Sequence, residues 1–303
     1  MSQKNIKNIA VSTRQKLLNK ARKDQRPFAE LLQYFAMERF LYRLSQSKYK
    51  DKFILKGALA LLAWNAPTVR PTKDIDLLGE FNNDVEVITQ VISEICEQDV
   101  EPNDGLTFDI KTITGIKIKE DADYQGVRVR FLSYLDTAKV TMQIDIGFGD
   151  SVYPKPEINT YPTLLDLPAP KLLSYSKETT IAEKLEAMVK LGELNSRMKD
   201  FYDIWLLSRQ FPFDGIDLQK AITGTFSQRG TEVPSEIKAF TESFIKVKDT
   251  QWKAFRNNIN SDAIPDTFEE VISQIRSFIH PIIVSTANEA DYNKCWLPES
   301  GWR

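Results

Sequence analysis

The stretch Asp74-Ile75-Asp76-Leu77-Leu78 predicts a short β-strand whose two faces differ in chemistry. Because side chains alternate along a strand, Asp74 and Asp76 share one face, while Ile75 and Leu77 share the opposite, buried face. Successive residues on one face of a strand lie about 7 Å apart. Two carboxylates at that spacing can converge on one metal ion or on two adjacent ions.

A second stretch, residues 139–148, repeats this alternation. Thr141, Gln143 and Asp145 fall on one face, and the other face is apolar from Val140 to Phe148. If this strand lies beside the first, Asp145 becomes a third carboxylate ligand. Three carboxylates on two strands suit two-metal chemistry on a nucleoside triphosphate (NTP), in which one ion lowers the pKa of an attacking hydroxyl and the other holds the triphosphate.

The residues before this motif decide between a metal site and a solvated strand end. An isolated Asp-x-Asp pair is more often the latter. Lys56 and Gly57, however, precede an apolar helix predicted over residues 57–64, and a glycine there lets the backbone approach phosphate groups closely. We therefore expect a nucleotide site that holds Mg²⁺ or Mn²⁺, the hard ions that oxygen ligands prefer.

The composition excludes several other kinds of site. The chain of 303 residues has one histidine, His280, so a zinc site with several His ligands is excluded, and a His-dependent catalytic triad would need that one residue. Cys96 and Cys295 lie far apart, which predicts free thiols in the reducing cytoplasm. No apolar run reaches about 18 residues, and residues 1–10 lack an apolar signal core, so neither membrane insertion nor secretion is expected.

The charge is distributed unevenly along the chain. Residues 1–50 contain twelve Lys or Arg against three acidic residues, a balance of +9, whereas the whole chain has a formal charge of -2. This asymmetry is typical of a basic surface for nucleic acid beside an acidic metal site, but a solvated helical face explains it equally well. The candidate nucleic-acid contacts in this segment are Arg14, Lys20, Arg22, Arg39 and Arg43.

Periodicity and turn signals predict an α+β protein in four segments. Basic helices occupy residues 1–50, a mixed-sheet core 51–165, a helical domain 166–285 and an irregular tail 286–303. In the core, residues 106–118, 126–135 and 139–148 read as consecutive antiparallel strands. A proline-rich connection, 154–170, marks the main boundary. The expected helices span residues 13–23, 27–45, 57–64, 84–96, 179–191, 197–209, 218–226, 234–246, 251–257 and 267–278.

Two patterns in the helical domain place charged residues where they could serve a site. Lys184 falls on the apolar stripe of its helix with Ile181 and Met188, so its ammonium either reaches a site or snorkels to solvent. Arg197, Asp200 and Asp203 recur every three residues and can share one helical face, either at a site or as intrahelical ion pairs.

Two arginines in the core share a strand face. Arg128 and Arg130 alternate with apolar residues, and their face is the one on which Asp145 could lie. They could bind a triphosphate or the backbone of a nucleic acid, or they could balance the charge of the carboxylates. The sequence favours neither.

Several stretches together resemble the AbiEii/AbiGii toxin family of DNA polymerase β-like nucleotidyltransferases, most closely its MenT branch. They are Phe53-Ile-Leu-Lys-Gly-Ala-Leu-Ala-Leu, Arg70-Pro-Thr-Lys-Asp-Ile-Asp-Leu-Leu-Gly79, Ile181-Ala-Glu-Lys-Leu-Glu-Ala-Met and Asn195-Ser-Arg-Met-Lys-Asp-Phe-Tyr-Asp-Ile204, with the basic N-terminal helices. The resemblance covers roughly residues 10 to 230. Many members have a second glycine where this chain has Ala58.

The resemblance implies a nucleotidyltransferase-type mixed sheet core with N-terminal helices and a C-terminal helical domain. It also implies roles for individual residues. Asp74 and Asp76 would be metal ligands, Thr72 would lie beside the incoming triphosphate, and Lys184, with Arg197, would contact the nucleotide phosphates. Either Asp200 or Asp203 would be the acidic residue of the last motif.

The function that the resemblance implies is that of a toxin in a bacterial toxin–antitoxin system. Such an enzyme would transfer a nucleoside monophosphate from an NTP to the 3′ acceptor end of a tRNA, which blocks translation, and a cognate antitoxin would neutralise it. Two alternatives stay open. The acceptor could be a protein or a small molecule, or the chain could be a catalytically silent module that binds nucleic acid or an antitoxin.

Overall fold

The computed structural model describes residues 3–66, 71–121, 124–259 and 264–303, which form two compact units. The first unit comprises Met1–Pro67, Pro71–Gly149 and Glu157–Ser174, and the second contains Asp150–Pro156 and Tyr175–Arg303. The predicted α+β class is confirmed. Residues 166–174, which the sequence assigned to the helical domain, group with the first unit.

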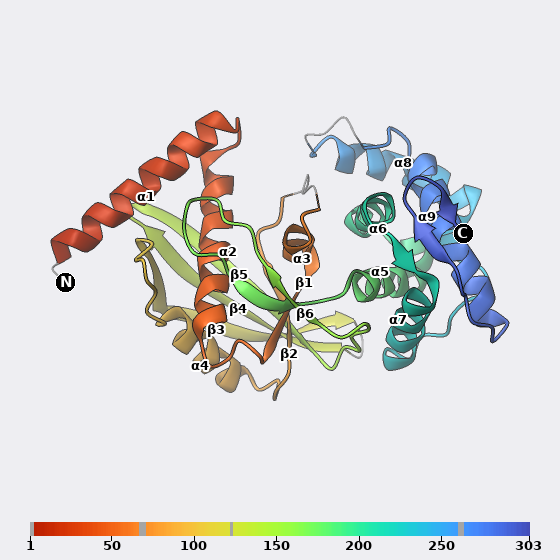
Figure 1. Ribbon diagram of the computed structural model, residues 1–303, viewed down its shortest axis with the longest axis horizontal. Helices are drawn as coiled ribbons and strands as arrows, with labels where there is room; N and C mark the ends of the chain where they lie inside the picture. Colours follow the sequence, from red (N-terminus) through yellow and green to blue (C-terminus); the bar gives the residue numbers. More distant parts are fainter. Residues whose placement is uncertain (1–2, 67–70, 122–123, 260–263) are drawn as a thin grey trace. The chain divides into compact units, whose positions relative to one another are not determined.

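A seven-stranded mixed sheet forms the framework of the first unit, in the order β3-β4-β5-β2-β1-β7-β6 (Figure 1). The antiparallel meander β3-β4-β5 matches the prediction, and β5 continues the sheet by pairing with β2 in parallel. Three strands of four residues each, β1, β6 and β7, were not predicted. The strands are β1 (Phe53–Lys56), β2 (Ile75–Gly79), β3 (Leu106–Asp121), β4 (Tyr124–Leu135), β5 (Ala138–Phe148), β6 (Glu157–Thr160) and β7 (Lys171–Ser174).

Helices cover one face of this sheet and leave the opposite face of β4 and β5 partly exposed. Helix α2 (Phe28–Gln46) crosses the strands and packs the ring of Phe40 against Phe108 and Phe131 (Figure 1). Helix α4 (Val85–Cys96) contributes Ile88 to the hydrophobic core. It begins at Asp84, whose side chain accepts hydrogen bonds from two backbone N–H groups. The short helix α3 (Gly57–Ala63) follows β1 directly.

Helix α1 (Gln3–Lys23) begins earlier than predicted. We expected Ser12 or Thr13 to cap its N-terminus, but both lie inside the helix, and the Thr13 side chain is buried. A capping residue acts only where the helical backbone stops, and nothing in residues 3–11 stops it.

The second unit is helical, with the small sheet β10-β9-β8 at its end. The predicted helices 234–246 and 251–257 are wrong: residues 242–256 form a single helix, α8, which follows the short 3₁₀ turn η2, and residues 234–237 are not helical. The predicted irregular tail is also wrong, because β9 and β10 form there. The elements are α5 (Lys177–Leu191), η1 (Gly192–Leu194), α6 (Met198–Gln210), β8 (Phe213–Asp214), α7 (Gly215–Gln228), η2 (Lys238–Phe240), α8 (Glu242–Arg256), α9 (Phe268–Ala287), β9 (Cys295–Leu297) and β10 (Gly301–Trp302).

Aromatic packing explains why the tail is ordered. Trp296 is buried and donates its indole N–H to the Ser208 carbonyl at 2.7 Å, while Trp302 stacks on Phe278 of α9. Among the helices that the structure describes, none is both long enough and apolar enough to cross a membrane.

Candidate active site

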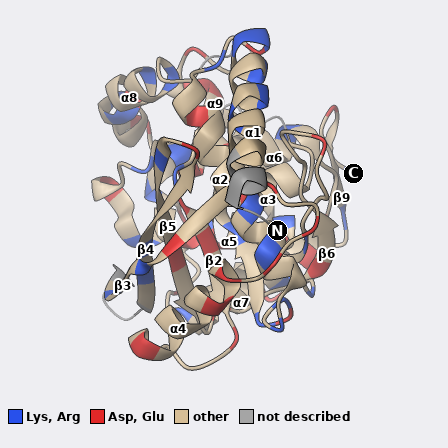
Figure 2. Cartoon of the chain, turned by 90° about the vertical axis from the view of Figure 1, so that its left-hand side faces the viewer, with Lys and Arg blue, Asp and Glu red and all other residues tan. Residues whose placement is uncertain are grey.

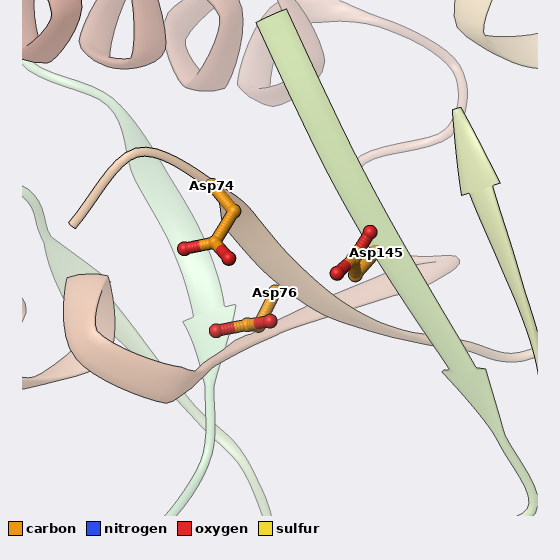
Figure 3. Close-up of side chains that lie close together, drawn as sticks. All are labelled: Asp74, Asp76 and Asp145. Atoms are coloured by element: carbon orange, nitrogen blue, oxygen red, sulfur yellow. The ribbon is translucent and has the colours of Figure 1, made fainter. Parts of the chain in front are cut away.

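Three aspartates converge at the centre of the mixed sheet (Figure 3). Strands β2 and β5 run in parallel with Asp76 opposite Asp145, and Asp74 lies immediately before β2. Each residue offers a carboxylate oxygen, and these oxygens all lie within 4.8 Å of one another. The sequence prediction that the three carboxylates meet is therefore confirmed in its geometry, because adjacent strands in register place the same face side by side.

Asp74 is oriented by its neighbours in the chain. Thr72 donates its hydroxyl to Asp74 Oδ1 at 2.6 Å, and the Thr72 backbone N–H donates to the Tyr34 hydroxyl at 3.1 Å. In addition, the Gln33 amide donates to the backbone carbonyls of Lys73, at 3.2 Å, and Thr141, at 3.4 Å. Helix α2 thereby fixes the segment that leads into β2. Arg70, which belongs to the same sequence motif, lies outside the described residues.

Gly57 provides the space for Asp76. Its φ of +67° lies in the left-handed region, and a Cβ atom placed on Gly57 would overlap the Asp76 carboxylate. Lys56, the last residue of β1, lies opposite Asp76 in the antiparallel register and is buried. Position 57 must therefore be a glycine because any larger side chain would displace the Asp76 carboxylate. The sequence did not reveal this reason.

Asp145 is held by two hydrogen bonds from the guanidinium of Arg128. Arg128 donates from Nε to Oδ1 and from Nη2 to Oδ2, both at 2.7 Å, and Gln143 adds a bond to Oδ2 at 3.2 Å. Arg130 donates twice to the Gln143 amide oxygen. The hydrogen bonds to Asp145 raise the pKa of Arg128 above its ordinary value. Arg128 therefore balances the charge of Asp145, which is one of the two roles that the sequence left open.

The donor set of this cluster fits a hard divalent cation. All three ligands offer carboxylate oxygens, with no nitrogen or sulfur ligand among them, which is the set that Mg²⁺ and Mn²⁺ prefer. Asp74 and Asp76 are half-buried, so each keeps access to solvent, while Asp145 is buried. Thr72 engages one oxygen of Asp74, and each carboxylate oxygen has two lone pairs to offer.

In the second unit, a lysine bridges two buried carboxylates. Lys184 of α5 lies 2.9 Å from Asp200 Oδ1 and 2.8 Å from Asp203 Oδ2, and both aspartates of α6 are almost fully buried. Arg197 Nε lies 2.7 Å from Asp200 Oδ2. Lys184 therefore joins the two helices, and Asp200 and Asp203 both contact it. The expected intrahelical pair, Arg197 with Asp200, is also present.

Comparison with known proteins identifies the family. The model of a family described as nucleotidyl transferase AbiEii toxin, type IV toxin–antitoxin system, matches residues 39–274. This chain belongs to the AbiEii toxin family. The match spans β2, β5, α5 and α6, and it makes the protein a nucleotidyltransferase.

Two solved structures are similar to this AbiEii family chain in fold. One is a crystal structure of a candidate nucleotidyltransferase from H. pylori, with a TM-score of 0.45 and 14% identity, covering 87% of this chain and 98% of that one. The other is JHP933 from Helicobacter pylori, with a TM-score of 0.43 and 15% identity, covering 83% of this chain and 92% of that one. No curated protein matches the sequence.

Two of the arginines expected at nucleic acid have a different place in this AbiEii family member. Arg39 and Arg43 of α2 are buried around Asp104, with Arg39 Nε at 3.0 Å and Arg43 Nη1 at 2.7 Å from Asp104 Oδ2. Neither can contact a nucleic acid, so this prediction is wrong. Burial raises the pKa of Asp104, but the hydrogen bond and charge of Arg43 outweigh it, and the pKa lies below its ordinary value.

The basic residues of α1 lie nearer the surface. Lys and Arg recur along this helix (Figure 2). Arg22 is exposed, Lys20 pairs with Asp24 at 3.0 Å, and Arg14 lies 3.9 Å from Asp136. The last turn alone contains Lys20, Arg22 and Lys23. These side chains are accessible in a way that those of Arg39 and Arg43 are not.

Sequence reasoning missed three residues that shape the carboxylate cluster: Gln33, Tyr34 and Gln143. Gln143 carried a usable signal, since it shares the polar face of β5 with Asp145 two positions away. Gln33 and Tyr34 had none, because they lie on a helix about 40 positions before the motif and no local pattern connects that helix to it.

Proposed function

We propose that this AbiEii family nucleotidyltransferase transfers a nucleoside monophosphate from an NTP to the 3′ end of a tRNA and depends on a divalent metal. The observation that carries the proposal is the convergence of Asp74, Asp76 and Asp145 within 4.8 Å. A cluster of this kind, in an enzyme that uses an NTP, suits in-line attack on a phosphorus atom. A modified acceptor end cannot be aminoacylated, which accounts for toxicity.

The reaction can be written with its atoms balanced. The 3′ hydroxyl of the acceptor loses its proton to solvent, and its oxygen forms a bond to the α-phosphorus. The bond from that phosphorus to the bridging oxygen breaks, and pyrophosphate leaves with the electron pair. Bound Mg²⁺ or Mn²⁺ would lower the pKa of the 3′ hydroxyl and neutralise charge on the leaving pyrophosphate. Asp74, Asp76 and Asp145 would hold this ion through their carboxylate oxygens.

Lys184 and Arg197 are proposed to contact nucleotide phosphates. Lys184 carries a charge that Asp200 and Asp203 hold in one orientation through ion pairs of 2.9 and 2.8 Å. An oriented ammonium loses less entropy when it meets a phosphate, which favours a phosphate-binding role. Asp200 and Asp203 then act through Lys184, and Arg197, which pairs with Asp200, offers a second cation.

The partners follow from charge and family. The exposed basic residues of α1 suit an RNA backbone, whose binding is largely electrostatic. Membership in a toxin–antitoxin family favours a cognate antitoxin as a protein partner. The MenT-like branch, on which the tRNA assignment depends, remains part of this proposal.

The deciding experiment incubates purified protein with total tRNA, Mg²⁺ and each α-³²P-labelled NTP in turn. We expect label at the 3′ end of tRNA, reduced to background by EDTA and by Asp74→Ala. The matched control is Asp109→Ala, which removes a carboxylate from β3 of the same sheet at a position outside the cluster. It should label tRNA at the wild-type rate.

Other outcomes lead to different conclusions. Label on protein alone would replace the tRNA acceptor with a protein acceptor. Label that survives EDTA and Asp74→Ala would contradict the carboxylate site. Folded protein that binds neither metal nor nucleotide would make the chain a silent binding module.

A further inference from the structure

The three carboxylates belong to a longer row of charges that crosses four strands. In the observed register Lys56 of β1 lies opposite Asp76 of β2, Asp76 opposite Asp145 of β5, and Asp145 opposite Arg128 of β4. A cation therefore flanks the acids at each end. Residues directly opposite one another on one face have Cβ atoms about 5 Å apart, so each charge in the row influences the next.

Both carboxylate oxygens of Asp145 already have hydrogen-bond partners. Both of them accept hydrogen bonds from Arg128 at 2.7 Å, and Oδ2 also accepts one from Gln143. Asp145 is 7% exposed, whereas Asp74 and Asp76 are half-buried. Paired N–H groups of a guanidinium match the geometry of a carboxylate, and the pair is strong for that reason.

A divalent ion must share Asp145 with this guanidinium. The arginine charge is permanent, and it lies against the same carboxylate that the ion would bind. The two cations therefore repel one another across Asp145, and the repulsion lowers the affinity of the cluster for metal. An anion that arrives with the metal, such as a triphosphate, reduces this repulsion.

We propose that Arg128 is the counter-cation of Asp145 and couples metal binding to nucleotide binding. In the absence of nucleotide it keeps the affinity of the carboxylate cluster for divalent ions low, so that the cluster fills completely only with an NTP. The inference rests on the proposed function, because it takes the three aspartates to be metal ligands. Arg128 acts on the metal through Asp145 and is a positioning residue.

The test is Mn²⁺ binding, measured by electron paramagnetic resonance with and without a non-hydrolysable NTP analogue. Without nucleotide, Arg128→Gln should bind Mn²⁺ about tenfold more tightly than wild type, since one nearby positive charge is gone. Arg128→Lys keeps that charge while losing the paired hydrogen bonds, and its affinity should stay within about twofold of wild type. The analogue should strengthen Mn²⁺ binding more in wild type than in Arg128→Gln, because that enhancement is the coupling.

The matched control is Lys139→Gln. It removes one positive charge from the exposed part of β5, the strand that carries Asp145, at a position six residues away. Its Mn²⁺ affinity should equal that of wild type within about twofold, since a solvated charge at this distance is largely screened. Circular dichroism of all three variants shows that any change in affinity occurs in folded protein.

Equal or weaker Mn²⁺ binding by Arg128→Gln would overturn the inference and leave Arg128 with an orienting role alone. Equal tightening in Arg128→Gln and Arg128→Lys would overturn it too, because the charge would not be the cause. Failure of the proposed function looks different. Wild-type protein would then bind no Mn²⁺ even with the analogue, or Asp74→Ala would bind it unchanged.

Discussion

Gly57 has a positive φ, and the space beside its α-carbon is filled by the carboxylate of Asp76. We expect Gly57→Ala to displace that carboxylate and to reduce nucleotidyl transfer by more than tenfold, since a misplaced ligand by itself costs about that much. Left-handed backbone strain adds about 1–2 kcal/mol of destabilisation. Transfer rate and urea unfolding measure the two effects separately.

Gly149→Ala separates strain from displacement. Gly149 also has a positive φ, of +80°, but no atom lies within 4 Å of its added Cβ. The Gly149→Ala variant should lose about as much stability as Gly57→Ala through backbone strain, but it should keep its activity. Equal loss of activity in both variants would contradict the assignment of Gly57 to Asp76.

Glu38 is a buried acid whose ionisation should limit stability. Burial raises its pKa to about 7, despite the backbone N–H of Leu164 and the charge of Arg39, which act in the opposite direction. A raised acidic pKa means that the folded state binds the proton more tightly than the unfolded state. The Glu38 contribution is therefore fully favourable below about pH 4.5, declines up to about pH 7 and is constant above that.

Glu38→Gln removes this titration while keeping the shape of the side chain. The free energy of unfolding of the variant relative to wild type should rise between pH 5 and pH 8 by up to roughly 3 kcal/mol. Urea unfolding at the two pH values measures it. A difference that does not change with pH would contradict the raised pKa.

For single residues, the sequence predicted correctly those positions that follow from the alternation of side chains along a strand. The alternation on β2 and β5 was enough to place Asp74, Asp76 and Asp145 on one face. The charge pattern of residues 1–50 wrongly placed Arg39 and Arg43 at a nucleic-acid surface, because their partner Asp104 lies more than 60 positions away. A basic helix looks the same whether its arginines meet solvent or a buried carboxylate.

Among the elements, those with clear periodicity were predicted well. The strands β3, β4 and β5 are long, with at least eleven residues each. In contrast, β1 has four residues that are all buried, so it shows no alternation at all. The tail strands β9 and β10 have three and two residues and depend on tertiary packing against α9. No local pattern can predict strands of that kind.

Helix α5, which carries Lys184, begins at a serine that has a purely structural role. Ser176 accepts the backbone N–H of Thr179 at 3.0 Å and donates its hydroxyl to the Tyr153 carbonyl at 2.8 Å. Ser176→Ala should lower the free energy of unfolding by about 1–2 kcal/mol. Ser176→Thr, which keeps the hydroxyl, should retain most of it. Urea unfolding that is equal for the alanine variant and wild type would show that the cap contributes nothing.

For the molecule as a whole, the uneven charge predicts how RNA binding responds to salt. Each phosphate contact that is lost reduces the slope of log K against log salt by about 0.7–0.9. Replacing Lys20, Arg22 and Lys23 of α1 with glutamine should therefore reduce the slope by about 2–3. Fluorescence anisotropy of labelled tRNA across a salt series measures it.

The control for this experiment changes the net charge by the same amount, but in another part of the chain. Lys246, Lys253 and Arg276 are exposed residues of the second unit, on α8 and α9. Their replacement with glutamine should leave the slope unchanged. An equal reduction would show that net charge, and not α1, determines RNA affinity.

The parallel pairing of β2 with β5 joins aspartates 69 positions apart in the chain. A ribosome that adds about 5–20 residues per second therefore makes Asp145 several seconds after Asp76. Until β5 has left the exit tunnel and paired with β2, only two of the three acids can lie together. An open reading frame that stops before codon 145 then yields a product without the cluster, so the first 144 of the 303 residues cannot form this site by themselves.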